Sequence, residues 1–106
     1  MAEEKNVFIH HVYFWLAEPK NAEHRQMLIE GLKKLSRAPS IQRYHIGQPA
    51  QTKRDVIDTT YSLSWCLFFA NAADQDSYQV DPIHLRFVAE CKHLWEKVQV
   101  YDTVDI

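Results

Sequence analysis

The chain has 106 residues and a formal net charge of −2, with 46% hydrophobic and 25% charged residues. This composition is typical of one globular domain and excludes an intrinsically disordered chain. No basic patch occurs, so neither a nucleic-acid nor a membrane-surface partner is expected. No run of about 20 apolar residues occurs and residues 1–5 are polar, which predicts a cytoplasmic protein. Neither Cys66 nor Cys91 has metal-site spacing, and both are predicted to be reduced core residues.

The first predicted element is a strand over Val7–Leu16, whose residues are mostly β-branched or aromatic. Both of its alternating faces are apolar, which is typical of a strand that is covered on both sides. Two helices cover only one face of a sheet, and the other face of this strand would leave an apolar patch in water. Covering that patch contributes about 25 cal/mol per Å² of apolar surface. The alternative is a cover from the segment 48–59 or from a terminus, and it is disfavoured because those segments are polar. The strand therefore predicts a homodimer that forms sheet against sheet.

An amphipathic helix follows, with Asn21 as its N-cap and Pro39 beyond its end. A second strand is predicted over Ile41–Gly47, because apolar and polar residues alternate there. The polar segment 48–59 is long for a loop inside a compact domain. A third strand follows it over Tyr61–Phe69.

Asn71 is a good N-cap for a short helical segment through Tyr78, and Pro82 fits the first position of another helix. The apolar face of that helix continues to Trp95, and a fourth strand is predicted over Val98–Val104. The order strand, helix, strand, strand, helix, strand indicates an α+β domain with a ferredoxin-like βαββαβ sheet. Both helices would then lie on one face of an antiparallel sheet.

Several segments resemble the stress-responsive dimeric α/β-barrel domain family. The most specific segment is Tyr78–His84, which contains Asp-Pro-Ile-His where the family often has His-Pro-x-His. The resemblance covers about residues 7–105 and implies a homodimer in which two sheets close a barrel. One relative, the plant olivetolic acid cyclase, closes a polyketide chain with a tyrosine–histidine pair and without a metal or bound cofactor. Tyr78 and His84 match that pair and are the candidate catalytic residues, while Leu63 and Gly31 replace two other pocket residues.

The resemblance also matches the first-strand histidine of the relative to His11. Alternation places His11 on the same strand face as Tyr13, and places His10 on the opposite face, toward a dimer partner if His11 faces the helices. If the face of His11 meets the helices, a single cleft would unite it with the Tyr78–His84 pair. The expected ligand-binding residues of that cleft are His11, Tyr13, Leu28, Gly31, Leu63, Trp65 and Trp95.

An imidazole can take up and return a proton near neutral pH, and a tyrosine hydroxyl can bind a developing oxyanion. These residues predict a homodimeric protein that binds a small molecule. The most specific version of this hypothesis is an enzyme that catalyses a cyclase, lyase or oxygenase reaction without a cofactor. The ligand expected is small and hydrophobic or aromatic. A non-catalytic stress-response or structural dimer is the alternative, in which His84 only packs the start of its helix. No cofactor is expected, and no metal, because no two histidines have a ligand-pair spacing.

Overall fold

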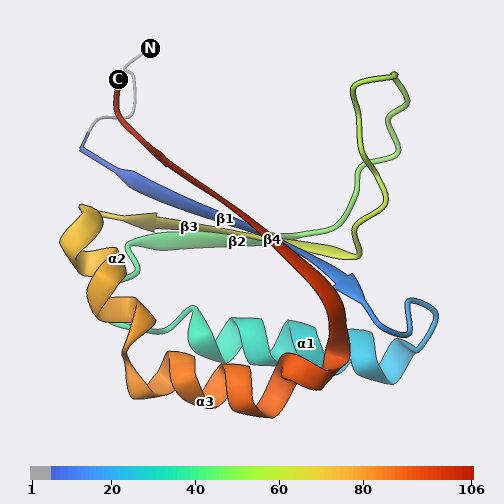
Figure 1. Ribbon diagram of the computed structural model, residues 1–106, viewed down its shortest axis with the longest axis horizontal. Helices are drawn as coiled ribbons and strands as arrows, with labels where there is room; N and C mark the ends of the chain where they lie inside the picture. The colour runs from blue at the N-terminus through green and yellow to red at the C-terminus, as the bar shows by residue number, and fades with distance from the viewer. Residues whose placement is uncertain (1–5) are drawn as a thin grey trace.

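The computed structural model describes residues 6–106, which form a four-stranded antiparallel sheet with its helices on one face (Figure 1). The strands, in the spatial order β2-β3-β1-β4, are β1 (Phe8–Leu16), β2 (Arg43–Gly47), β3 (Leu63–Phe69) and β4 (Trp95–Val104). The helices are α1 (Ala22–Leu35), α2 (Ala72–Gln79), α3 (Pro82–Cys91) and the short 3₁₀ turn η1 (Lys92–Leu94). The predicted ferredoxin-like fold is confirmed. No helix within residues 6–106 could cross a membrane, and the expectation for residues 1–5 lies outside the described residues.

Local capping interactions set the helix starts that the sequence predicted. The Asn21 side chain accepts a hydrogen bond from the backbone N–H of His24 over 3.0 Å, and the Asn71 side chain caps α2 in the same way. The end of α3 differs from the prediction, because Trp95 begins β4 instead of closing the helix face. Trp95 pairs with Leu16 of β1. This long-range strand pairing decides the conformation of Trp95, although the spacing of the apolar residues favours a helix.

The predicted single cleft required the face of β1 that carries His11 and Tyr13 to meet the helices. In the structure the opposite face of β1 meets the helices. Val12, Phe14 and Leu16 face the helices and are at most 4% exposed, and His10 shares their face at 6%. The other face carries residues that are only partly buried: Ile9, His11, Tyr13 and Trp15. Phe14 and Leu16 have no polar atom, whereas most side chains on the other face have a polar tip that favours solvent or a polar partner. The helix side of β1 is therefore apolar apart from His10.

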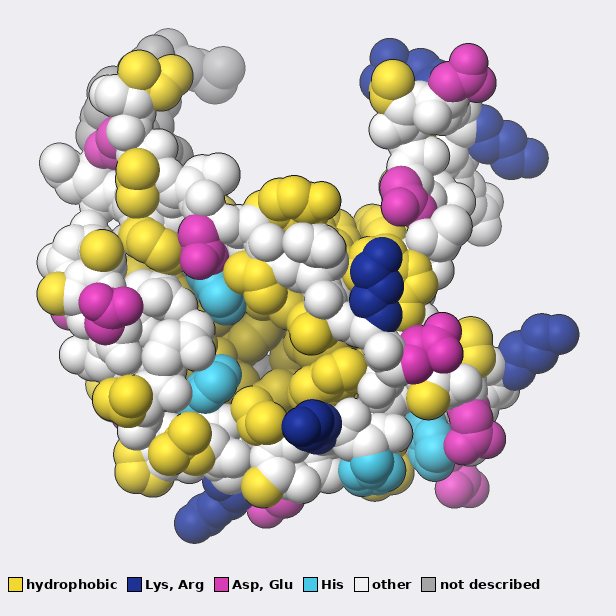
Figure 2. All heavy atoms as spheres, viewed as in Figure 1, with side chains coloured by type: hydrophobic (Ala, Val, Ile, Leu, Met, Phe, Trp, Pro, Cys, Tyr) yellow, Lys and Arg dark blue, Asp and Glu magenta, His cyan; other side chains and the backbone are white. Residues whose placement is uncertain are grey.

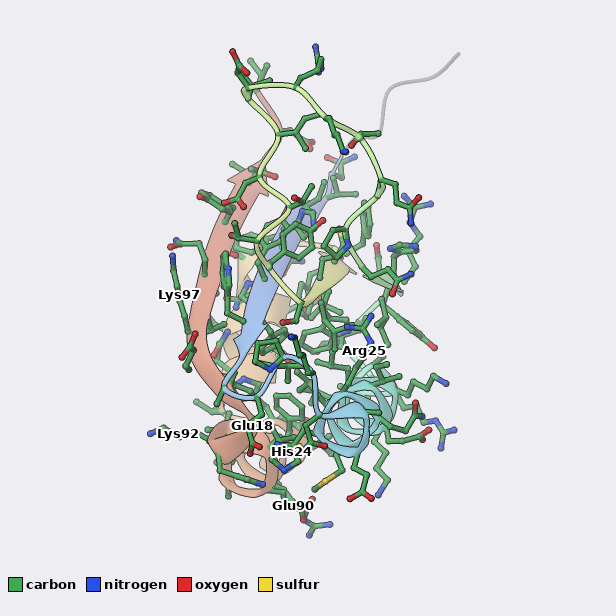
Figure 3. The ribbon with its side chains drawn as sticks, turned by 90° about the vertical axis from the view of Figure 1, so that its right-hand side faces the viewer. Glu18, His24, Arg25, Glu90, Lys92 and Lys97 are labelled. Carbon is green, nitrogen blue, oxygen red and sulfur yellow. The ribbon has the colours of Figure 1, made fainter. Side chains whose placement is uncertain are left out.

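The segment between β2 and β3 rises from the sheet on the side away from the helices (Figures 1 and 3). Arg25 of α1 reaches up to the base of this segment, as Figure 3 shows. Its guanidinium donates to the Ser62 carbonyl over 3.2 Å and to the Gln48 side chain over 2.5 Å. Trp15 donates its indole N–H to the Thr60 hydroxyl over 3.0 Å. Both ends of the segment are therefore held against the domain, and it borders the open face of the sheet.

Candidate functional site

A hollow lies between the sheet and the helix layer, and Figure 2 shows hydrophobic side chains lining it and histidine side chains along one side. Three polar side chains from three elements meet on this inner side of the sheet. The ring centroid of Tyr78, from α2, lies 4.8 Å from that of His84, from α3, and 6.3 Å from that of His10, from β1. Tyr78 is 1% exposed, so the cluster is deep in the fold.

Two atoms of this cluster are buried without a hydrogen bond. The hydroxyl of Tyr78 and Nδ1 of His84 have no partner within residues 6–106. Leaving a buried polar group unpaired costs about 1–3 kcal/mol, and native proteins rarely tolerate it without a reason. The two unpaired atoms lie on adjacent rings and make this cluster the candidate site.

Burial determines the protonation states of Tyr78 and His84. Burial raises the pKa of the Tyr78 hydroxyl far above its usual value, and the nearby Asp81 carboxylate adds to this rise. Burial lowers the pKa of His84, and the neighbouring His10 lowers it further, while the Gln79 backbone and Asp81 act in the opposite direction. At neutral pH, Tyr78 therefore remains a hydrogen-bond donor and His84 remains a neutral imidazole.

His10 belongs to the cluster, although the sequence predicted that it would face a dimer partner if His11 faced the helices. It faces Asp102 of β4 in the β1–β4 register, and its Nδ1 lies 2.6 Å from an Asp102 carboxylate oxygen. Asp102 interrupts a row of valines on β4, at alternate positions. A charged residue in an apolar strand row was the signal in the sequence that could have identified this contact.

Most of the predicted apolar pocket residues lie around the cluster or in the adjoining core. Leu28 and Leu63 are buried, and the Trp65 ring lies 6.3 Å from that of Tyr78. Trp95 stacks on Phe87 at 5.8 Å and belongs to the same core.

Gly31 lies elsewhere, at the seam between α1 and α3. A Cβ atom at Gly31 would stand 2.9 Å from Sγ of Cys91 and 3.2 Å from the Phe87 ring, so the absence of a side chain allows close helix packing. The groove beside it, of about 300 Å³, is also bordered by the exposed Lys34 and Arg86. The structure thus places Gly31 in a helix contact and does not bring it to Tyr78.

His11 and Tyr13 lie on the open face, so the sheet separates them from Tyr78 and His84. Their rings stack at 4.5 Å, and the Tyr13 hydroxyl is 3.3 Å from Nδ1 of His11. The predicted cleft that unites all four residues is not formed. Cys66, which was predicted to be a core residue, is also on this face and is partly exposed.

The open face has a cavity of its own, of about 300 Å³, beneath the segment that follows β2. Its walls are mainly aromatic, and it is lined by Tyr13, Trp15, Asp58, Tyr61, Gln99 and Tyr101. Burial and the nearby His45 lower the pKa of His11, whose ring stacks on that of Tyr13. Within residues 6–106, no group of three or more His, Cys, Asp or Glu side chains is arranged to hold a metal ion.

Solved structures with a similar fold come from several organisms. A ferredoxin-like Dabb family protein from Mesorhizobium loti has a TM-score of 0.78 and 22% identity, with 94% of this chain and 97% of that chain covered. The hydroxynitrile lyase from Passiflora edulis has a TM-score of 0.78 and 18% identity, covering 97% and 96%. A dimeric ferredoxin-like protein of unknown function from Thermobifida fusca has a TM-score of 0.77 and 14% identity, covering 99% and 96%. These likenesses show the fold.

The family model gives a more specific result. No protein with a curated description matches the chain. The model of the stress-responsive A/B barrel domain, Dabb, matches residues 9–105, which is nearly the whole chain. The chain therefore belongs to the Dabb stress-responsive A/B barrel domain family.

Proposed function

We propose that the hollow binds a small, mainly apolar carbonyl compound, and that Tyr78 and His84 act on it without a cofactor. The observation that carries this proposal is the pair of buried, unpartnered atoms on two adjacent rings, the Tyr78 hydroxyl and Nδ1 of His84. Apolar side chains around the hollow suit a ligand with an aromatic or aliphatic body. A carbonyl oxygen would accept the hydrogen bond that the Tyr78 hydroxyl has no protein group to receive.

The reaction class that fits is proton transfer next to a carbonyl group, as in cyclase or lyase chemistry. Tyr78 stabilises the negative charge that forms on the carbonyl oxygen, and a neutral imidazole in the cluster moves the proton. The Passiflora protein with this fold is a hydroxynitrile lyase, which supports a lyase among the reactions that the fold accommodates. The alternative is a non-catalytic dimer in which the Tyr78–His84 contact serves packing alone.

A ligand screen by thermal shift tests the proposal. Aryl ketones and 1,3-diketones are expected to raise the Tm of the wild-type protein, and Tyr78→Phe and His84→Gln are expected to reduce this rise. His93→Gln is the matched control, because His93 is exposed on η1 and should leave the rise unchanged. A rise of equal size in all four proteins, or none in any, contradicts a ligand site at Tyr78 and His84.

We also propose that a second copy of the chain covers the open face of the sheet. The exposed Tyr101 joins Tyr13 and Tyr61 in a cluster of edge-on aromatic contacts there, with Tyr13 at its centre. Aromatic residues with a polar tip are enriched in protein–protein interfaces. The description of the Thermobifida fusca protein as dimeric supports the same assembly. This assembly is compatible with both the catalytic and the non-catalytic alternative.

A further inference from the structure

We propose that His10, held by Asp102, is the base that removes the proton from the bound carbonyl compound, while Tyr78 binds the carbonyl oxygen. This inference rests on the proposed function and assigns the proton transfer to a residue that the resemblance to the family does not indicate.

The contact between His10 and Asp102 has the geometry of an oriented base. The two residues are direct partners in the β1–β4 register, and Nδ1 of His10 lies 2.6 Å from the carboxylate. Because the carboxylate only accepts hydrogen bonds, Nδ1 carries the hydrogen and Nε2 is the nitrogen that can take a proton. The carboxylate also stabilises the positive charge that forms on the ring during the transfer, as in other base–carboxylate pairs.

Packing fixes the ring of His10 against the same aromatic wall as the proposed ligand site. Its centroid is 6.3 Å from that of Tyr78 and 6.5 Å from that of Phe69, both in edge-on contacts. His10 is 6% exposed, whereas the Asp102 side chain is 44% exposed. The imidazole is therefore inside the fold, and its carboxylate partner lies at the surface.

His84 has a different environment. No carboxylate is within hydrogen-bond distance of its Nδ1 among residues 6–106, and burial lowers its pKa. A neutral, weakly basic imidazole suits the acceptance of a hydrogen bond from a ligand hydroxyl or a water molecule. His84 thus acts as a positioning residue, and the two histidines have separate roles.

The proposed step conserves atoms and electrons without another reactant. The hydrogen on the carbon next to the carbonyl passes as a proton to Nε2 of His10, and the electron pair of that C–H bond forms the carbon–carbon double bond of an enolate. The carbonyl π electrons move to oxygen, which accepts the hydrogen bond of Tyr78. Return of a proton from Nε2 of His10 to carbon restores the ketone. In D₂O the returning particle is a deuteron when the proton on Nε2 has first exchanged with a solvent molecule in the hollow.

Acetophenone in D₂O is the probe, because its methyl protons exchange slowly without a catalyst and its ring is apolar. Proton NMR follows loss of the methyl signal, and saturation transfer from protein to acetophenone measures binding separately. Wild-type protein is expected to accelerate exchange. His10→Asn should lower the rate by about 100-fold or more, the usual contribution of a general base. Asp102→Asn should give a smaller loss with unchanged binding, and Glu96→Gln, which changes an exposed carboxylate on the same strand, should give none.

A second measurement distinguishes a variant that has lost its fold from a wrong assignment of the base. In the wild-type protein, ¹⁵N-histidine NMR should show His10 with its proton on Nδ1, and Asp102→Asn should shift this tautomer while the fold is retained. Absence of acetophenone binding would count against the proposed function itself. Binding with exchange that depends on His84 and is unchanged in the His10 and Asp102 variants would overturn the base assignment alone. Binding without exchange in the wild-type protein would contradict the proposed proton transfer as well.

Discussion

Trp65 of β3 donates its indole N–H to the hydroxyl of Ser36, just beyond α1, over 2.9 Å in a buried contact. The Ser36 hydroxyl in turn donates to the Leu32 carbonyl over 2.7 Å. Ser36→Ala removes the acceptor and leaves the indole N–H buried and unpaired. We expect a loss of about 1–3 kcal/mol in the free energy of unfolding, measured by urea denaturation. Ser77→Ala, on the exposed surface of α2, is the control and should change little; an equal loss in both variants would refute the buried contact.

Replacement of Tyr78 by Phe should separate stability from function. The variant keeps the ring that packs beside His84 and removes the hydroxyl that has no partner. We expect the free energy of unfolding of the ligand-free protein to rise by about 1 kcal/mol, because a buried unpaired polar group is removed. Tyr61→Phe, on the partly exposed open face, should leave it unchanged. A clear destabilisation by Tyr78→Phe would mean that the hydroxyl has a protein partner in solution.

The stability of the protein should fall on acidification. In the unfolded chain a histidine has a pKa of about 6.5, and burial lowers the pKa of His84 in the folded protein. Below about pH 6.5 the unfolded chain therefore binds more protons than the folded one, and the free energy of unfolding decreases. His84→Gln should reduce the slope of this decrease between pH 6.5 and 5. His11, whose pKa burial also lowers, should account for part of the remaining slope. An unchanged slope in His84→Gln would contradict the lowered pKa of His84.

Gly31→Ala should destabilise the seam between α1 and α3. The added Cβ would stand 2.9 Å from Sγ of Cys91, and the cost of overpacking, about 1–3 kcal/mol, exceeds the gain of about 1 kcal/mol in helix propensity. Cys91→Ala in the same chain removes the clashing atom, so the double variant should be more stable than the sum of the single effects predicts. Additive effects in thermal or urea unfolding would show that the contact is relaxed in solution.

The proposed homodimer can be tested on a tyrosine of the open face. Tyr101→Glu places a charge in the aromatic cluster and should give a species near 12.5 kDa by sedimentation, whereas the wild type should have twice that mass. Tyr44→Glu is a matched control, since Tyr44 is 48% exposed against 58% for Tyr101 and lies on the helix side of β2. A monomeric wild type at micromolar concentration would refute the dimer.

The helix starts and the order of elements could be predicted from the sequence because they depend on local interactions. Asn21, Asn71 and Pro82 act within one helical turn of their own positions, and their roles were predicted correctly. The orientation of β1 could not be predicted in the same way. Both of its faces are apolar, and a period of two does not say which face meets the helices.

Only those contacts of the candidate site that join residues close together in the sequence were predicted. Tyr78 and His84 are six residues apart on consecutive helices, and the structure brings them together. His10 and Asp102 are 92 residues apart, so only the β1–β4 register reveals their contact. His11 was favoured over its neighbour by the resemblance, and the choice depended on an orientation that packing of the whole sheet decides.

In β1, His10 turns toward the hollow and His11 toward the open face. One strand thus supplies a side chain to the proposed catalytic cluster and, at the next position, one to the proposed contact with a second copy. An insertion or deletion of a single residue in this strand would exchange the two sets of side chains at once. Such a change in the length of β1 would therefore alter the proposed ligand chemistry and the proposed assembly together.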